Sequence, residues 1–205
     1  QESLYHVSHQ GLEFYLDEAG YTVTNASLAG QSNTVTVESL QRSLDSTYNY
    51  VFWFKSDPLR CLRPYDATVF NKDVTVEKLQ DICKEQSRVT YDFLNKLDKK
   101  IYCIGGCFAL YDFINEYENL IPVIPSVIKL CYPDFILPDL WFSDWIDLID
   151  KHYVDLERFT AVKRVQDSLA LPDRAEYFWP DGRHANRKAH KLIFDVLDKQ
   201  LGLTQ

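Results

Sequence analysis

The stretch YNYVFWF, residues 48–54, consists almost entirely of aromatic and β-branched residues. It lacks the alternation of apolar and polar residues that marks a strand with one solvated face. A continuous apolar run of this length is typical of a strand buried on both faces, as in a parallel sheet covered by helices. This stretch therefore predicts a central strand of an α/β protein.

The segments on either side of this strand extend the same pattern. Residues 36–44 and 75–99 carry apolar side chains at helical spacing, and KIYCIGG, residues 100–106, predicts a second strand that ends in glycines. Strands alternating with helices indicate parallel βαβ units with right-handed crossovers. We expect a single α/β domain over residues 1–205, with about five parallel strands between two helical layers. The other expected strands are 4–7, 21–26 and 120–124, and the other expected helices are 10–20, 143–169 and 186–201.

Composition and charge exclude several classes of protein. Hydrophobic residues make up 46% of the chain and the net charge is −8, which argues against disorder and against a nucleic-acid-binding surface. The longest apolar runs are too short to span a membrane, and no signal peptide is visible. One basic cluster is interpreted as a solvated helix face rather than a phosphate site: Arg183, Arg187, Lys188 and Lys191.

The cysteines predict a reducing, cytoplasmic environment. There are five, an odd number with scattered spacing, so a disulfide framework is not expected and core packing is. No zinc-type pair of ligands follows Cys103 and Cys107, and no metal or other cofactor is predicted. Methionine is absent even at position 1, so we expect a processed or trimmed chain.

In open parallel sheets the active site lies beyond the carboxyl ends of the strands, so the residues after each strand are the candidates. Each also has a plain structural interpretation: Ser8 is a suitable helix N-cap, and the glycines suit turns. The polar residues after the 48–54 strand either bind substrate or form surface ion pairs. The candidates at these positions are Ser8, Gly30, Asn33, Lys55, Asp57, Arg60, Gly106 and Cys107.

The segment FWPDGRHANRKAHKLIFDVL, residues 178–197, adds an acid and a base directly before the last helix. The spacing of Asp181 and His184 allows the carboxylate to reach one imidazole nitrogen. The other nitrogen is then left to act as a base toward a serine. The same Pro-Asp-Gly letters are also an ordinary turn signal.

This order of residues resembles the SGNH (GDSL-type) hydrolases, including phage-type members of that family. The last block, with Asp181 and His184 before a helix, is the best matching piece, and HVSHQGLEFYLDEAGYTVTNASLAGQSN, residues 6–33, resembles the family's opening. The resemblance implies a three-layer flavodoxin-like fold and a triad of Ser8, His184 and Asp181. It also implies an oxyanion hole built from Gly30, with Gly106 and Cys107 at the next block. A small ester or acylated-sugar substrate follows from the same resemblance.

The chain departs from the family pattern at two blocks. His6 and Val7 stand where the family has Gly-Asp before the serine, and the Gly-x-Asn block is replaced by glycines and Cys107, without the asparagine that donates to the oxyanion. Asn33 is a candidate substitute. The losses motivate an alternative, an inactive SGNH-like binding or structural module such as a virion component. A catalytic serine hydrolase and an inactive module are thus the two hypotheses.

Overall fold

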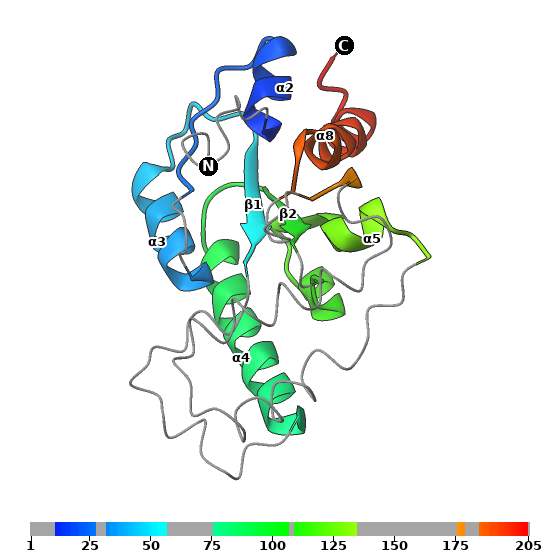
Figure 1. The fold of residues 1–205 in the computed structure, drawn as a ribbon. Coiled ribbons are helices and arrows are strands. Elements are labelled where there is room, and N and C mark those ends of the chain that lie inside the picture. The colour runs from blue at the N-terminus through cyan, green and yellow to red at the C-terminus, as the bar shows by residue number, and fades with distance from the viewer. Residues whose placement is uncertain are drawn as a thin grey trace.

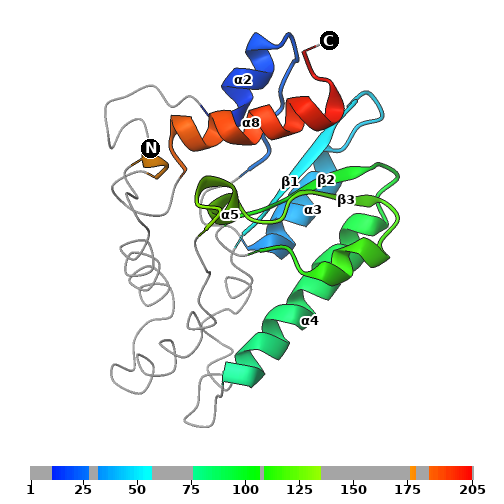
Figure 2. The same cartoon turned by 90° about the vertical axis from the view of Figure 1, so that its right-hand side faces the viewer.

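The computed structural model is an α/β protein with a parallel sheet and helices against both of its faces (Figures 1 and 2). It describes residues 11–27, 32–56, 76–106, 109–134, 176–178 and 185–204. The described elements, in chain order, are α2 (Leu12–Glu18), α3 (Asn33–Ser43), β1 (Val51–Lys55), α4 (Val76–Asn95), β2 (Ile101–Gly105), η3 (Asp112–Glu116), β3 (Leu120–Ile124), α5 (Val127–Cys131) and α8 (Arg187–Leu201).

The sheet has the order β1-β2-β3, with every described pair parallel. Val51 pairs with Ile101 and Lys55 with Gly105, so β1 and β2 end at the same level. The pairing of β2 with β3 shifts between Cys103 and Ile104. Because all three strands point the same way, their last residues converge on one edge of the sheet.

Two separate apolar clusters cover the two faces of the sheet. On one face, α3, α4 and η3 pack against Trp53, Ile101 and Cys103. On the other face, α2, α5 and α8 pack against Ile104 and Val123. Figure 2 shows these two helical groups on opposite sides of the strands. Most of β2 is therefore buried, with Tyr102 intermediate. The expectation that residues 48–54 are buried on both faces is wrong for β1, because Val51, Trp53 and Lys55 are buried whereas Phe54 on the other face is exposed.

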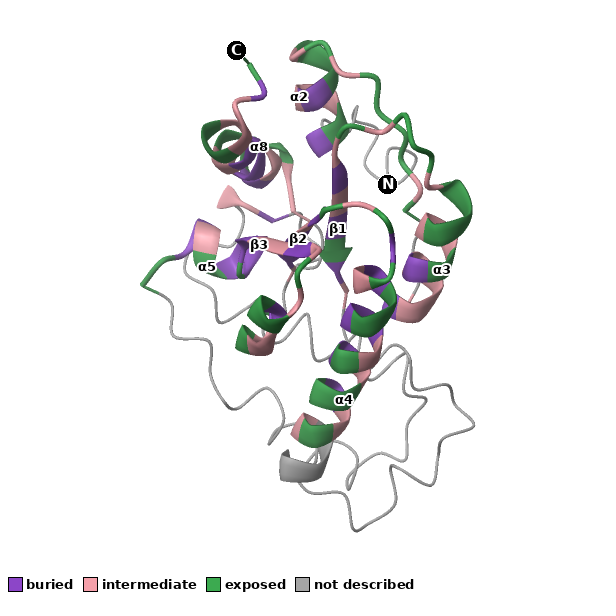
Figure 3. Ribbon diagram, turned by 180° about the vertical axis from the view of Figure 1, so that it is seen from behind, coloured by how far each residue is buried: buried purple, intermediate pink, exposed green. Residues whose placement is uncertain are grey.

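Local sequence sets the bounds of the long helices. The buried residues of α8 recur at helical spacing and lie on one side of the helix in Figure 3: Ala189, Ile193, Phe194 and Leu197. The Asn186 side chain caps the start of α8 by accepting from the Lys188 and Ala189 amides. Gly202, with φ of 65°, ends the helix in the left-handed conformation that glycine adopts without strain.

The expected elements and the observed ones agree for most of the described chain. The helices expected at 10–20, 75–99 and 186–201 are α2, α4 and α8, and the strands expected at 48–54, 100–106 and 120–124 are β1, β2 and β3. The helix expected at 36–44 is α3, which begins three residues earlier, at Asn33. The short η3 and α5 are not predicted by the sequence.

One expected strand is wrong, and the sheet is smaller than expected. Residues 21–27 form no strand, and Thr22, Val23 and Thr24 are exposed. A β-branched run forms a strand only where a neighbour supplies hydrogen bonds and a face to bury, and this run buries little. The described part of the sheet has three strands, against the expected five. The expected strand 4–7 and the expected helix 143–169 lie outside the described residues.

Candidate functional site

The carboxyl edge of the sheet brings together the residues that follow the three strands. Lys55 and Ser56 end β1, Gly105 and Gly106 end β2, and Ser126 follows β3 at the start of α5. Ser126 joins two of these strand ends, because its Oγ donates to the Gly106 carbonyl over 3.2 Å. This edge is the place where an α/β sheet carries its ligand site.

The glycine pair after β2 allows backbone segments to pack closely. A Cβ on Gly105 would overlap the carbonyl oxygen of Pro125, and a Cβ on Gly106 would lie 2.7 Å from the carbonyl oxygen of Lys55. Only glycine fits such an approach without displacing a neighbouring strand. The predicted oxyanion residue Gly106 therefore lies at the candidate edge, where packing alone also requires a glycine. Gly30 and Cys107 lie outside the described residues.

Asn33 joins the start of α3 to the end of β1. Its side chain is 5% exposed, its Nδ2 donates to the Ser56 carbonyl over 3.1 Å, and its Oδ1 accepts from the Ser56 amide over 2.8 Å. The asparagine predicted to bind substrate is thus at the expected edge, with its amide engaged by the backbone of Ser56. Two other predicted substrate-binding residues, Asp57 and Arg60, lie outside the described residues.

Lys55 is the least expected charged group at this edge, because its side chain is only 3% exposed. Its Nζ donates to the Ala109 carbonyl over 2.7 Å and lies 4.0 Å from the centre of the Tyr111 ring. A charge-assisted hydrogen bond and an aromatic face are what a buried ammonium requires. The alternation along β1 indicates this burial, since Lys55 continues the inward positions of Val51 and Trp53.

Two phenols next to Lys55 remain neutral at neutral pH. Burial raises the pKa of both Tyr91 and Tyr111 well above the usual value for tyrosine. The Tyr91 hydroxyl oxygen accepts from the Tyr111 amide over 3.4 Å, which partly offsets the effect of burial on the Tyr91 pKa. These groups can serve as hydrogen-bond partners at this edge but not as bases.

The loop that carries the predicted acid and base is held at both ends. Phe178 and Ala185 form an antiparallel bridge, and the Asn186 amide donates to the Tyr177 carbonyl over 2.8 Å. Phe178 is buried and stacks on Tyr132, the residue directly after α5. Asp181 and His184 themselves lie outside the described residues. The chain on either side of them is fixed next to α5, which follows β3 at the carboxyl edge (Figure 2).

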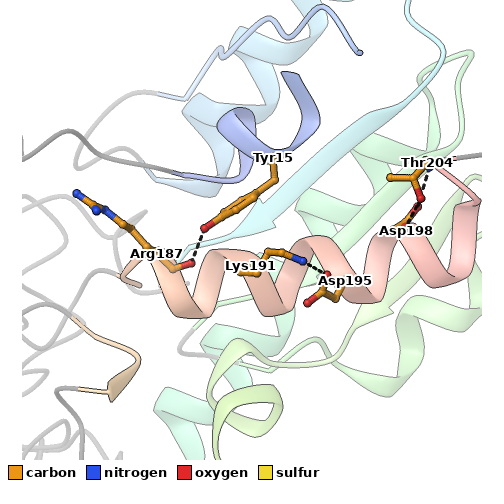
Figure 4. A network of polar contacts seen from close by, with 6 residues as sticks. All are labelled: Tyr15, Arg187, Lys191, Asp195, Asp198 and Thr204. Atoms are coloured by element: carbon orange, nitrogen blue, oxygen red, sulfur yellow. Dashed lines mark hydrogen bonds and ion pairs between the residues drawn. The ribbon is translucent and has the colours of Figure 1, made fainter. Parts of the chain in front are cut away.

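The first turns of α2 and α8 are in direct contact. The Tyr15 hydroxyl donates to the Arg187 carbonyl over 3.2 Å, as Figure 4 shows, and the Tyr15 and Phe194 rings are 5.9 Å apart. Ser8, which lies outside the described residues, precedes Gly11 by three positions, and His184 directly precedes Ala185. The chain thus leads from each predicted catalytic residue to one of two touching helices.

Two basic residues of α8 are paired with acidic ones. Lys188 forms an ion pair with Glu176, and Lys191 forms one with Asp195 (Figure 4), while the side chains of both lysines are about half exposed. This arrangement agrees with a solvated helix face and not with a cluster collected around a phosphate. Arg183, the fourth member of the cluster, lies outside the described residues.

Several aromatic and cysteine side chains lie in the core. Trp53 and Tyr132 are buried among apolar side chains, whereas Trp141 and Trp145 lie outside the described residues. The described cysteines, Cys83, Cys103 and Cys131, are buried, as expected for core packing. Burial raises the pKa of the Cys103 thiol to about 12, so this sulfur is not a nucleophile.

The described residues contain neither a metal-binding cluster nor a membrane-spanning helix. No group of three or more His, Cys, Asp or Glu side chains is arranged to hold a metal ion in the described part of the chain. Among the helices that the structure describes, none combines the length and hydrophobicity needed to cross a bilayer.

Comparison with protein-family models, with curated proteins and with solved structures gives no match to this chain.

Proposed function

We propose that the protein is a serine hydrolase of the SGNH type that cleaves small carboxylic esters or removes acyl groups from sugars. In this proposal the described sheet is part of a three-layer flavodoxin-like fold, and the active site lies at its carboxyl edge. Ser8 is the nucleophile, His184 the base and Asp181 the acid that orients it.

The contact between Tyr15 and Arg187 is the observation that carries the proposal. Ser8 is at most about 11 Å along the chain from Gly11, the N-cap of α2, because an extended chain spans no more than 3.6 Å per residue. His184 is one residue from Ala185, which is itself two residues before α8. Two short tethers ending on touching helices allow the hydroxyl and the imidazole to meet.

The placement of the helices supports the same topology. The helix α4 connects β1 to β2 on one face of the sheet, whereas α2 and α8 both pack on the opposite face. Ser8 precedes α2 and His184 precedes α8 in the sequence, so both predicted catalytic residues lead into the same helical layer.

The chemistry follows from these assignments. Ser8 Oγ attacks the ester carbonyl while His184 takes its proton, and His184 then returns the proton to the leaving alcohol. Water hydrolyses the acyl-enzyme by the same route. Backbone N–H groups of Ser8, Gly30, Gly106 and Cys107 are the proposed oxyanion donors. No cofactor is needed, and the odd number and scattered spacing of the five cysteines suit the proposed reducing, cytoplasmic location.

The test is hydrolysis of p-nitrophenyl acetate by the wild type and by Ser8→Ala, with Ser46→Ala as the control. Ser46 lies in the exposed turn before β1, where its hydroxyl donates to Asp45. We expect Ser8→Ala to lower kcat by about 10³-fold or more, as removal of a triad member does, and Ser46→Ala to leave it unchanged. Equal rates for wild type and Ser8→Ala overturn the proposal.

The second candidate function is an inactive SGNH-like module that binds or builds a larger assembly. It is favoured by the close packing that already accounts for Gly105 and Gly106, and by the engagement of the Asn33 amide with Ser56. No described side chain is therefore left to replace the family's asparagine as a donor to the oxyanion. A wild-type rate no higher than that of Ser8→Ala, in folded protein, supports this module.

A further inference from the structure

We propose that Lys55 is a positioning residue that fixes the backbone at the carboxyl end of β2, and through it the oxyanion donor at Gly106; this rests on the proposed function. Lys55 is not part of the Ser-His-Asp set. Its position links the end of β1 to Gly106 and Ala109, the described residues on either side of positions 107–108.

The backbone of Lys55 contacts Gly106, and its side chain contacts Ala109. Its carbonyl oxygen packs against Gly106 at a distance that excludes any Cβ there. Its ammonium donates to the Ala109 carbonyl over 2.7 Å, three residues further along. One residue of β1 therefore sets where the chain leaves β2 and where it returns.

Each of the three residues 109–111 is held by a different element. Ala109 is bound by Lys55 of β1, the Leu110 amide donates to Pro125 after β3 over 2.8 Å, and the Tyr111 amide donates to Tyr91 of α4 over 3.4 Å. On the other side, the Gly106 carbonyl accepts from Val127 and Ser126. Of the three bonds described here to residues 109–111, the one from Lys55 is made by a charged group.

A buried ammonium is an unusual way to hold one carbonyl, and it has a physical reason here. An ion that is removed from water needs strong partners in place of the water. At Lys55 the Ala109 carbonyl and the face of Tyr111 are two of these partners, which forces both to stay in place. Misplacing oxyanion donors by about 1 Å costs on the order of 10²-fold in rate. The proposed reaction therefore needs the Gly106 backbone to be held in a fixed position.

The chain offers a matched control in Lys99. Its Nζ also holds backbone carbonyls, those of Ser46 at 2.8 Å and Tyr48 at 2.9 Å, but it does so before β1, at the amino end of the sheet. Lys99→Met thus removes a comparable lysine clamp far from the candidate site.

The experiment compares Lys55→Met, Lys55→Arg and Lys99→Met with the wild type by hydrogen exchange and by kinetics on p-nitrophenyl acetate. Met has a side chain of similar length without a charge to bury, so the variant is expected to fold. In Lys55→Met we expect exchange of the Leu110 and Tyr111 amides to rise about tenfold. We also expect kcat to fall about 10- to 100-fold with KM within twofold, the pattern of a lost transition-state interaction.

Lys55→Arg keeps the charge and the donors, so its amide exchange and kcat are expected to stay close to the wild-type values. Lys99→Met is expected to change neither the exchange of these amides nor kcat. Unchanged exchange at residues 109–111 in Lys55→Met overturns the inference, as does faster exchange with an unchanged kcat. If Ser8→Ala instead hydrolyses the ester at the wild-type rate, the proposed function fails. Exchange then still decides whether Lys55 holds this segment.

Discussion

At the scale of single residues, backbone packing at the ends of β2 and β3 leaves no room for side chains. Gly105 faces two backbone groups, the Pro125 carbonyl and the Leu110 amide, neither of which can rotate away. Gly20, in contrast, has nothing within 4 Å of an added Cβ, and needs glycine only because its φ is 89°. Close packing therefore requires glycine at position 105, whereas the backbone conformation requires it at position 20.

We predict that Gly105→Ala lowers the free energy of unfolding by about 2–3 kcal/mol, because strands must move apart to accept the methyl group. Gly20→Ala is the control and is expected to cost about 1 kcal/mol, the strain of the left-handed conformation alone. Urea unfolding measures both. A loss in Gly105→Ala no larger than in Gly20→Ala contradicts the packing seen at the strand ends.

At the scale of elements, the start of α8 links a helix to the loop of the predicted acid and base. The Asn186 side chain caps the helix through its oxygen, and its Nδ2 donates to the Glu176 carbonyl over 2.8 Å. One residue thus stabilises the helix and holds the chain on the far side of the loop.

We predict that Asn186→Ala lowers the free energy of unfolding by about 1–2 kcal/mol, since it removes the N-cap. Asn186→Asp retains a good cap but loses the donor to Glu176, so its loss should be smaller. Chemical denaturation of the two variants separates the contributions. Equal losses in both would show that the cap contributes nothing and that only the bond to Glu176 matters.

Sequence patterns predict the elements that bury a continuous or periodic apolar face. The three strands and the long helices are of this kind. One failure is an element whose state depends on distant neighbours, since residues 21–26 lack a described strand partner. The other is a helix boundary: α3 begins at Asn33, after Ser32 caps the helix by accepting from the Val35 amide over 3.4 Å. Short helices such as η3 carry too few residues for a period to show.

At the scale of the whole molecule, the core between the sheet and α4 contains groups that ionise only at high pH. Burial raises the pKa of the Cys103 thiol from about 9 to about 12, and raises the pKa of the Tyr91 and Tyr111 phenols as well. In the unfolded chain these groups lose protons at lower pH than in the folded chain. The folded state thus binds more protons, and stability falls as pH rises above about 9.

We predict alkaline unfolding that begins above pH 9. Cys103 alone removes about 2 kcal/mol by about pH 10.5, since each unit above the unfolded pKa and below the folded one costs about 1.4 kcal/mol. Urea midpoints measured from pH 7 to pH 10.5 test this, with Cys103→Ala as the comparison. That variant should be less stable at pH 7 but lose less on raising the pH. Parallel pH curves for the two proteins contradict the prediction.

The candidate site is only partly accessible to sequence reasoning. The order of serine, glycines and Asp-x-x-His predicts residues at the carboxyl edge, and Gly106 and Asn33 lie there. The contact of Tyr15 with Arg187 joins residues 172 positions apart, and no local pattern encodes it. Lys55 stands one position after the predicted strand, and its burial depends on Tyr111 and Ala109, which come from another connection.

The central claim is that the Ser8 hydroxyl and the His184 imidazole meet at the carboxyl edge of the sheet. The most direct test is labelling with an alkyl fluorophosphonate, in which an activated serine oxygen bonds to phosphorus and fluoride leaves, followed by peptide mapping. The account predicts one phosphonyl group per chain, on Ser8, formed at least about 10²-fold more slowly in His184→Ala. Labelling at another residue, no labelling of folded protein, or equal rates with and without His184 would contradict it.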